Sequence, residues 1–117
     1  MSAQEIKGED YVVRYDEDSV SVIFKGELAL GGPKEYAPIN ELLSEIADGS
    51  PEEITIDLKG LAFLNSSGIS MLSKFVLGLR KKKEIQLVIL GSNDMPWQGK
   101  SLKNLQKFLP SLRLDME

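Results

Sequence analysis

Two runs near the start of the chain alternate apolar and polar residues with the period of a half-buried strand. The first run covers residues 11–15 and the second residues 20–24, and the polar segment Asp16-Glu17-Asp18 lies between them. This pattern predicts a β-hairpin. Residues 26–33 follow as a predicted loop, because they contain Gly31-Gly32-Pro33.

A first helix is predicted after this loop, because its apolar residues recur at helical spacing. Pro33 suits the first turn, where its missing N–H costs no hydrogen bond. Asp48-Gly49-Ser50-Pro51 places a Gly and a Pro where a helix usually stops. The apolar stripe consists of Tyr36, Ile39, Leu42, Leu43 and Ile46.

The rest of the chain alternates predicted strands and helices. Strands are expected at 54–58, 85–90 and 112–116, helices at 69–79 and 102–109, and an apolar connection packed on the core at 60–64. The order β-β-α-β-α-β-α-β predicts one α/β domain with a mixed sheet and parallel crossovers in its centre. We expect this single domain to take up residues 1–117, with a core at about 11–116 and flexible residues at 1–9.

The composition removes the commonest catalytic and metal-binding chemistry. The 117 residues contain no cysteine and no histidine. Disulfides, Ser-His-Asp and Cys-His nucleophile systems, and the usual zinc and iron ligands are therefore excluded. We expect a protein that is not an enzyme, with no catalytic residue, no metal and no cofactor. The net charge of −4 argues against nucleic acid as a direct partner.

The sequence also predicts a cytoplasmic location. Residues 1–7 lack the apolar core of a signal peptide, and the apolar run at 85–90 is too short to span a bilayer. The absence of cysteine is compatible with a reducing compartment. We expect a soluble protein without membrane contact.

One segment carries the most functional information: Ile54 to Ile69, which reads ITIDLKGLAFLNSSGI. Asn65 or Ser66 can cap the helix that follows, because their side-chain oxygens accept from free backbone N–H groups. A structural cap is one interpretation. The other is a switch at Ser66, because a phosphate at the positive end of a helix is stabilised and leaves the fold intact.

These residues resemble the STAS domain, specifically the bacterial anti-sigma factor antagonists. The resemblance rests on the strand, the apolar connection and Asn65-Ser66-Ser67-Gly68, on the triplet Gly26-Glu27-Leu28 after the second strand, and on the element order over residues 11–116. It implies a STAS-like mixed sheet with helices packed mainly on one face.

The resemblance also implies a mechanism. A serine kinase that is itself an anti-sigma factor phosphorylates the Ser that follows the acidic position of the motif, here Ser66. The unphosphorylated form binds the kinase and frees a sigma factor or other client, and a PP2C-type phosphatase resets the switch. Met71 lies one turn along the same helix and completes the expected contact surface. The expected partner-binding residues are Gly26, Glu27, Leu28, Asn65, Ser66, Ser67, Gly68 and Met71, with Gly68 allowing close approach of a partner backbone.

Two departures from the family pattern keep an alternative open. The family usually has Asp where this chain has Asn65, and often Asp directly after the Gly-Glu-Leu triplet, where this chain has Ala29. Both favour a STAS-fold small-molecule sensor or scaffold without a phosphoswitch. Turnover by the isolated domain would be needed to support an enzyme.

Three other features have simpler interpretations. Arg80 to Lys83 suits the negative end of a helix, with contact to an anion or acidic partner as the alternative. Asp57 is expected to make a local hydrogen bond, and Trp97 to pack at the rim of the core, although an exposed Trp would indicate a contact site. Gly31-Gly32 lacks the Lys-Ser/Thr ending of a phosphate-binding loop.

Overall fold

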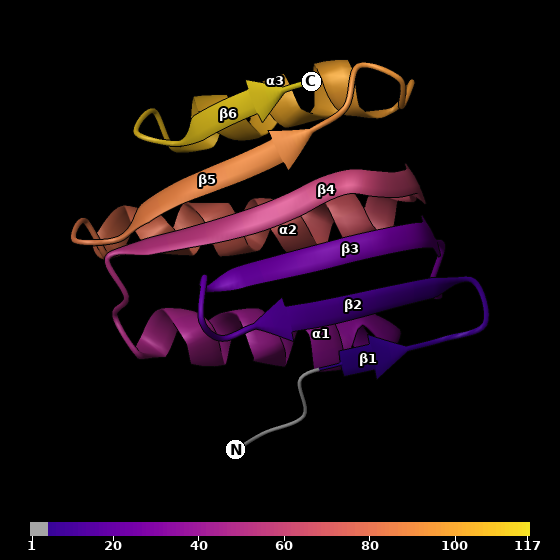
Figure 1. Ribbon diagram of the computed structural model, residues 1–117, viewed down its shortest axis with the longest axis horizontal. Coiled ribbons are helices and arrows are strands. Elements are labelled where there is room, and N and C mark those ends of the chain that lie inside the picture. The colour runs from indigo at the N-terminus through magenta and orange to yellow at the C-terminus, as the bar shows by residue number, and fades with distance from the viewer. Residues whose placement is uncertain (1–4) are drawn as a thin grey trace.

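The computed structural model describes residues 5–117, which form one mixed β-sheet with three α-helices on one face (Figure 1). The strands are β1 (Glu5–Lys7), β2 (Tyr11–Asp16), β3 (Ser21–Leu28), β4 (Glu53–Leu64), β5 (Gln86–Gly91) and β6 (Arg113–Met116). They lie in the sheet in chain order. β1 to β3 pair antiparallel, whereas β3 to β6 pair parallel. The predicted α/β mixed sheet with parallel crossovers is therefore confirmed.

The helices are the crossovers between the parallel strands. They are α1 (Pro33–Asp48), α2 (Ser66–Gly78), which a short 3₁₀ helix η1 (Leu79–Lys81) extends, and α3 (Gln98–Phe108). Pro33 occupies the first turn of α1 and Gly49 ends it, as predicted. The five residues of the predicted apolar stripe are all buried. Within residues 5–117, no helix is long and apolar enough to cross a membrane.

The core lies between the sheet and the helices. Alternate side chains of the central strands point into it, as strand geometry requires. These include Val22 and Phe24 of β3, Ile54, Ile56 and Leu58 of β4, and Leu87 and Ile89 of β5, all nearly or fully buried. The other face of the sheet, which no helix within residues 5–117 covers (Figure 1), carries polar residues such as Arg14 and Lys25 together with apolar ones such as Ile23.

The N-terminal prediction was wrong in part. Residues 1–9 were expected to be flexible, yet Glu5–Lys7 form β1 and pair with Val12 to Arg14 of β2. This strand is three residues long with a single apolar side chain, Ile6, so it offers too few positions for an alternating pattern. Residues 1–4 lie outside the described part of the chain.

Two predicted connections also proved to be strand. Gly26-Glu27-Leu28 is the end of β3 and not the start of a loop, and residues 60–64 continue β4. The two strands pair to their ends through register shifts, one of them between Gly26 and Glu27. The extra residues lie in β4, because the consecutive Gly26 and Glu27 pair with Leu61 and Phe63, and they interrupt the two-residue period of β4 but not that of β3.

Side chains at the start of α3 protect the end of β4 on the side where β5 no longer pairs with it. The pairing of β4 with β5 stops at Asp57 and Leu90. Beyond it, Gln98 Nε2 donates to the carbonyls of Leu58 (2.7 Å) and Leu61 (3.1 Å). The indole N–H of Trp97 donates to the same Leu61 carbonyl (2.8 Å), and its ring packs against the core, as expected. Buried carbonyls are thus satisfied where the ladder ends.

Candidate functional site

The candidate site lies where the parallel strands β3 and β4 end and α2 begins. Parallel strands bring their carboxyl ends to one edge of the sheet, so the Gly-Glu-Leu and Asn-Ser-Ser-Gly segments meet there. Leu28 pairs with Leu64, and the backbone N–H of Asn65 donates to the Leu28 carbonyl (3.1 Å). The structure therefore brings together two segments that are almost 40 positions apart in the sequence.

Asn65 is the N-cap of α2. Its Oδ1 accepts from the backbone N–H of Gly68 (3.0 Å) and from the phenol of Tyr36 (2.7 Å). Its backbone carbonyl accepts the N–H of Ile69, the first bond of the helix (3.0 Å). Of the two candidate caps that the sequence offered, the structure uses Asn65 and leaves Ser66 free for another role.

The amide nitrogen of Asn65 explains why this chain has Asn and not Asp at the cap. Nδ2 donates to the backbone carbonyl of Leu30, in the loop between β3 and α1, at 2.9 Å. A carboxylate has no proton to donate and would place a negative oxygen against that carbonyl. The cap therefore joins three segments of the chain: α2, α1 through Tyr36, and the β3–α1 loop.

Tyr36 is a buried residue of α1 that hydrogen-bonds to the capping side chain of Asn65. Its ring is 1% exposed, and its hydroxyl donates to Asn65 while accepting from the N–H of Leu30 (3.4 Å). Burial raises the pKa of the Tyr36 phenol above its ordinary value, and the hydrogen bond from Leu30 offsets part of that rise. The phenol therefore keeps its proton at neutral pH and remains a donor.

Gly68 is required by packing inside the domain. A Cβ at this position would lie 2.8 Å from the Tyr36 hydroxyl and would overlap the side chain of Leu64. Gly68 is buried, and its missing Cβ is needed for contacts inside the domain. Its missing side chain lets α2 start directly against the end of β4 and against α1.

Ser66 is the first residue of α2, and its side chain is exposed. Within residues 5–117 its hydroxyl forms no hydrogen bond. The backbone N–H groups of Ser66 and Ser67 have no acceptor inside the helix, because the first turn of any α-helix leaves them free. The site thus presents a hydroxyl next to N–H donors at the positive end of α2.

The Gly-Glu-Leu triplet holds β3 beside this site. Gly26 has φ +96°, and a Cβ there would collide with the carbonyl oxygen of Asp10. The next N–H, that of Glu27, donates to the same oxygen (2.9 Å). Only Gly adopts this backbone conformation without strain. Leu28 is fully buried, whereas Glu27 is exposed.

The structure adds Phe63, an exposed side chain near the end of β4 and three residues before Ser66. Its ring is 44% exposed although it is a large apolar side chain, and it pairs in the sheet with Glu27. The sequence placed Phe63 in a connection packed on the core. Exposed aromatic side chains are common anchors in protein contacts. The sequence Phe63-Leu64 did not show which of the two side chains faces solvent, because the register shift in β4 changes the alternation of buried and exposed positions.

The eight predicted contact residues differ in how far they are exposed to solvent. Glu27 and Ser66 are exposed, and Gly26, Asn65 and Ser67 are half-buried. Leu28, Gly68 and Met71 are buried in the domain. Met71 still lines the floor of a groove of about 320 Å³ between α1 and α2, together with Pro33, Tyr36, Asn40, Ser67, Ser70 and Lys74.

Comparison with known proteins identifies the class of this domain. Residues 35–110 match the family model of the STAS domain, and the chain therefore belongs to the STAS domain family. STAS domain proteins are generally regulators and not enzymes. No curated protein sequence matches the chain.

Solved structures share the fold at low sequence identity. SiaC of Pseudomonas aeruginosa is 13% identical over 100% of this chain and 98% of that chain, with a TM-score of 0.74. A chain from the P. aeruginosa complex of the diguanylate cyclase SiaD with its activator SiaC is 14% identical over 97% and 98%, with a TM-score of 0.67. An anti-sigma factor antagonist from Mycobacterium paratuberculosis is 20% identical over 88% and 85%, with a TM-score of 0.61. The TM-scores show that these proteins share the fold of this chain, although their sequence identities to it are low.

Two glycines of α2 give opposite stability predictions. Gly68→Ala should lower the free energy of unfolding by roughly 1–3 kcal/mol, because its methyl group overlaps Leu64 and Tyr36. Gly78→Ala should raise it by up to about 1 kcal/mol, because nothing lies within 4 Å and Ala favours the helix. Urea denaturation measures both. A neutral or stabilising Gly68→Ala would contradict the close packing of α2.

Substitutions of Asn65 should rank by the hydrogen bonds that they remove. Asn65→Ala loses the cap and leaves Tyr36 and Leu30 without their partner, so we expect a loss of about 2–4 kcal/mol. Asn65→Asp keeps both acceptor bonds but loses the donation to Leu30 and places a negative oxygen against that carbonyl, so we expect a loss of about 1–3 kcal/mol. The same changes at the exposed Asn93 serve as controls. If Asn65→Asp is as stable as the wild type, the Leu30 bond contributes nothing.

Proposed function

We propose that this chain is a phosphorylation-controlled, protein-binding regulator of a partner-switching pathway in the cytoplasm. A serine kinase that resembles an anti-sigma factor phosphorylates Ser66 and is also the binding partner, and a PP2C-type phosphatase removes the phosphate. One observation supports this above all others: Ser66 has an exposed hydroxyl on the first residue of α2, and Asn65 holds that position from three sides.

A phosphate at Ser66 changes the charge of the surface without unfolding the domain. It adds about −1.5 to −2 charges, beside the free N–H groups of the first helical turn and at the positive end of the dipole. Because Asn65 is neutral, the preceding side chain does not repel it. Asn65 accepts from Gly68 and not from Ser66 or Ser67, so modification leaves the cap intact.

The partner surface consists of Ser66 with the exposed Glu27 and Phe63. In the unmodified state, Phe63 supplies apolar area and Ser66 a small neutral group. Phosphorylation would bury an unpaired charge in that contact, which typically costs a few kcal/mol and is enough to release a partner.

Two of the structural likenesses support our proposal for the clients of this switch. One similar protein is an anti-sigma factor antagonist, and another, SiaC, is the activator of a diguanylate cyclase. We infer that the partner of this chain is an anti-sigma-type kinase, and that its downstream client is either a sigma factor or a nucleotide cyclase. The chain itself carries out no catalysis.

A small-molecule sensor is the second candidate, because the groove between α1 and α2 opens next to the switch. Its lining combines the apolar Met71 and Pro33 with the hydroxyls of Ser67 and Ser70 and the ammonium group of Lys74. Such a lining suits a small anionic ligand with an apolar part. A thermal shift by such a ligand, lost in Lys74→Ala and obtained without any protein partner, would favour this function.

The phosphoswitch predicts labelling at one serine. Incubated with ATP and the anti-sigma-type serine kinase of the same genome, the chain should gain a single phosphate that mass spectrometry maps to Ser66. Ser66→Ala should abolish labelling, and Ser67→Ala, its matched control, should keep it. Ser66→Asp should weaken kinase binding at least tenfold in a pull-down, and Ser67→Asp much less. Phosphate on another residue, or full labelling of Ser66→Ala, would refute the switch.

A further inference from the structure

Two of the helical segments of this chain contain basic residues and no acidic ones. Residues 66–83, which form α2, η1 and the turn after them, and residues 98–108, which form α3, contain eight of the 14 Lys and Arg residues. None of the 18 Asp and Glu residues lies in these two segments. The net charge of −4 conceals this arrangement. We call the surface of these eight residues the basic face: Lys74, Arg80, Lys81, Lys82, Lys83, Lys100, Lys103 and Lys107.

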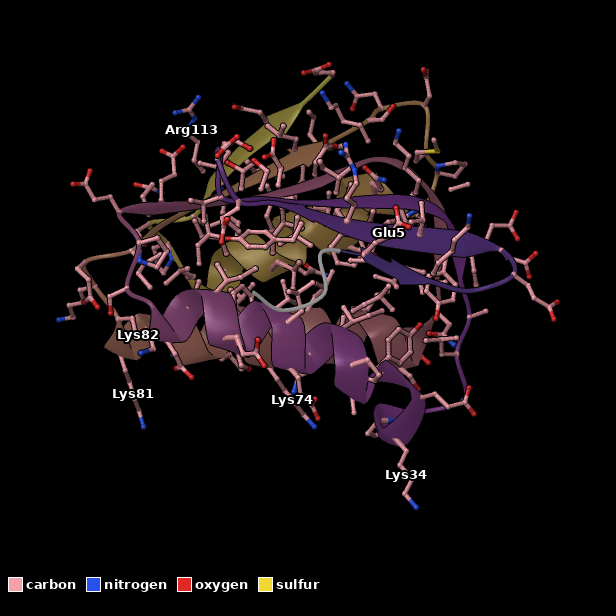
Figure 2. All side chains as sticks on the ribbon, turned by 60° about the horizontal axis from the view of Figure 1, so that its bottom comes forward. Glu5, Lys34, Lys74, Lys81, Lys82 and Arg113 are labelled. Carbon is pink, nitrogen blue, oxygen red and sulfur yellow. The ribbon has the colours of Figure 1, made fainter. Side chains whose placement is uncertain are left out.

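The basic face spans two helices that contact each other. α2 and α3 lie side by side on the same face of the sheet (Figure 1). The guanidinium of Arg80 donates to the backbone carbonyl of Phe108, which joins the end of α2 to the end of α3. Seven of the eight residues are exposed, and Lys82 is half-buried. Figure 2 shows Lys74 and Lys81 pointing away from the sheet.

Helix stability does not account for these charges. The cations after α2 do suit its negative end, but Lys100 lies in the first turn of α3, where the dipole disfavours a cation. Lys100, Lys103 and Lys107 also lie three and four positions apart, where like charges repel. Among residues 5–117, only Lys82 of the basic face has a carboxylate in ion-pair contact, that of Asp48 at 3.9 Å.

Two exposed apolar side chains lie within the basic face. Leu77 and Phe108 are each 37% exposed. Leu77 lies three positions after Lys74 and four before Lys81, on the same side of the helix. Phe108 lies beside Arg80, which binds its carbonyl. Cations that surround apolar side chains complement a partner with the opposite arrangement.

We propose that the basic face binds an acidic amphipathic helix of a partner protein. Its carboxylates pair with the lysines, and its apolar side chains cover Leu77 and Phe108. A wide polyanion such as duplex nucleic acid or an anionic membrane fits less well, because α1 lies beside α2 and exposes Glu41 and Glu45. The basic face extends toward the opposite end of α2 from Ser66, so this second contact does not depend on the proposed phosphoswitch.

A synthetic probe tests this contact directly. The probe is a fluorescent peptide of about 18 residues, with Leu at i, i+3, i+4 and i+7 and Glu elsewhere. Fluorescence anisotropy should show binding to the full chain that weakens as salt rises. Lys74→Glu with Lys103→Glu should reduce affinity roughly tenfold or more. The matched control, Lys7→Glu with Lys25→Glu on the uncovered face of the sheet, should change it less than about twofold.

Three further measurements decide the outcome. Leu77→Ser with Phe108→Ser should also weaken binding, and Ser66→Asp should leave it unchanged, with thermal melts confirming that each variant is folded. Equal losses in the two double charge variants, or no binding of the probe at low salt, would overturn the proposal. Tighter binding of duplex DNA or phosphatidylserine vesicles through Lys74 and Lys103 would overturn it in favour of those ligands.

Discussion

The side-chain amide of Asn65 is the interaction on which the rest of the site depends. One oxygen accepts from the start of α2 and from Tyr36 of α1, and one nitrogen donates to the loop after β3. Each of these groups is partly or fully removed from water and would be costly to leave unpaired. Because a single side chain satisfies them together, α2 has a fixed starting point, and Ser66 is presented at a defined place on the surface.

This arrangement separates the group that holds the fold from the group that carries the signal. Many helix caps use a Ser hydroxyl, and phosphorylation of such a Ser would remove the cap at the moment of signalling. Here Asn65 is the cap and the adjacent Ser66 is free. The basic face uses the other end of the same helix. α2 therefore offers two contact surfaces with different chemistry, one that phosphorylation changes and one with constant positive charge.

The sequence predicted the fold class, the order of the main elements and the position of the helix that begins at Ser66, because these follow from apolar periods and local caps. It did not predict the features that depend on pairing between strands far apart in the sequence. An extra residue in β4 opposite Gly26 and Glu27 shifts the pairing of the ends of β3 and β4, and the short strand at Glu5–Lys7 is defined by its neighbour β2. The exposure of Phe63 depends on the register shift in β4, and the burial of Gly68 depends on how α2 meets β4 and α1, which no local pattern records.

The central claim is that phosphorylation of Ser66 changes charge while the Asn65 cap stays formed. Amide hydrogen exchange at Gly68 tests it most directly, because this N–H donates to Asn65 Oδ1 and to no other group in residues 5–117. Compared between the unmodified and the Ser66-phosphorylated chain, its protection should be unchanged. A large loss of protection at Gly68 on phosphorylation would show that the modification opens the helix, and that the switch acts by local unfolding instead.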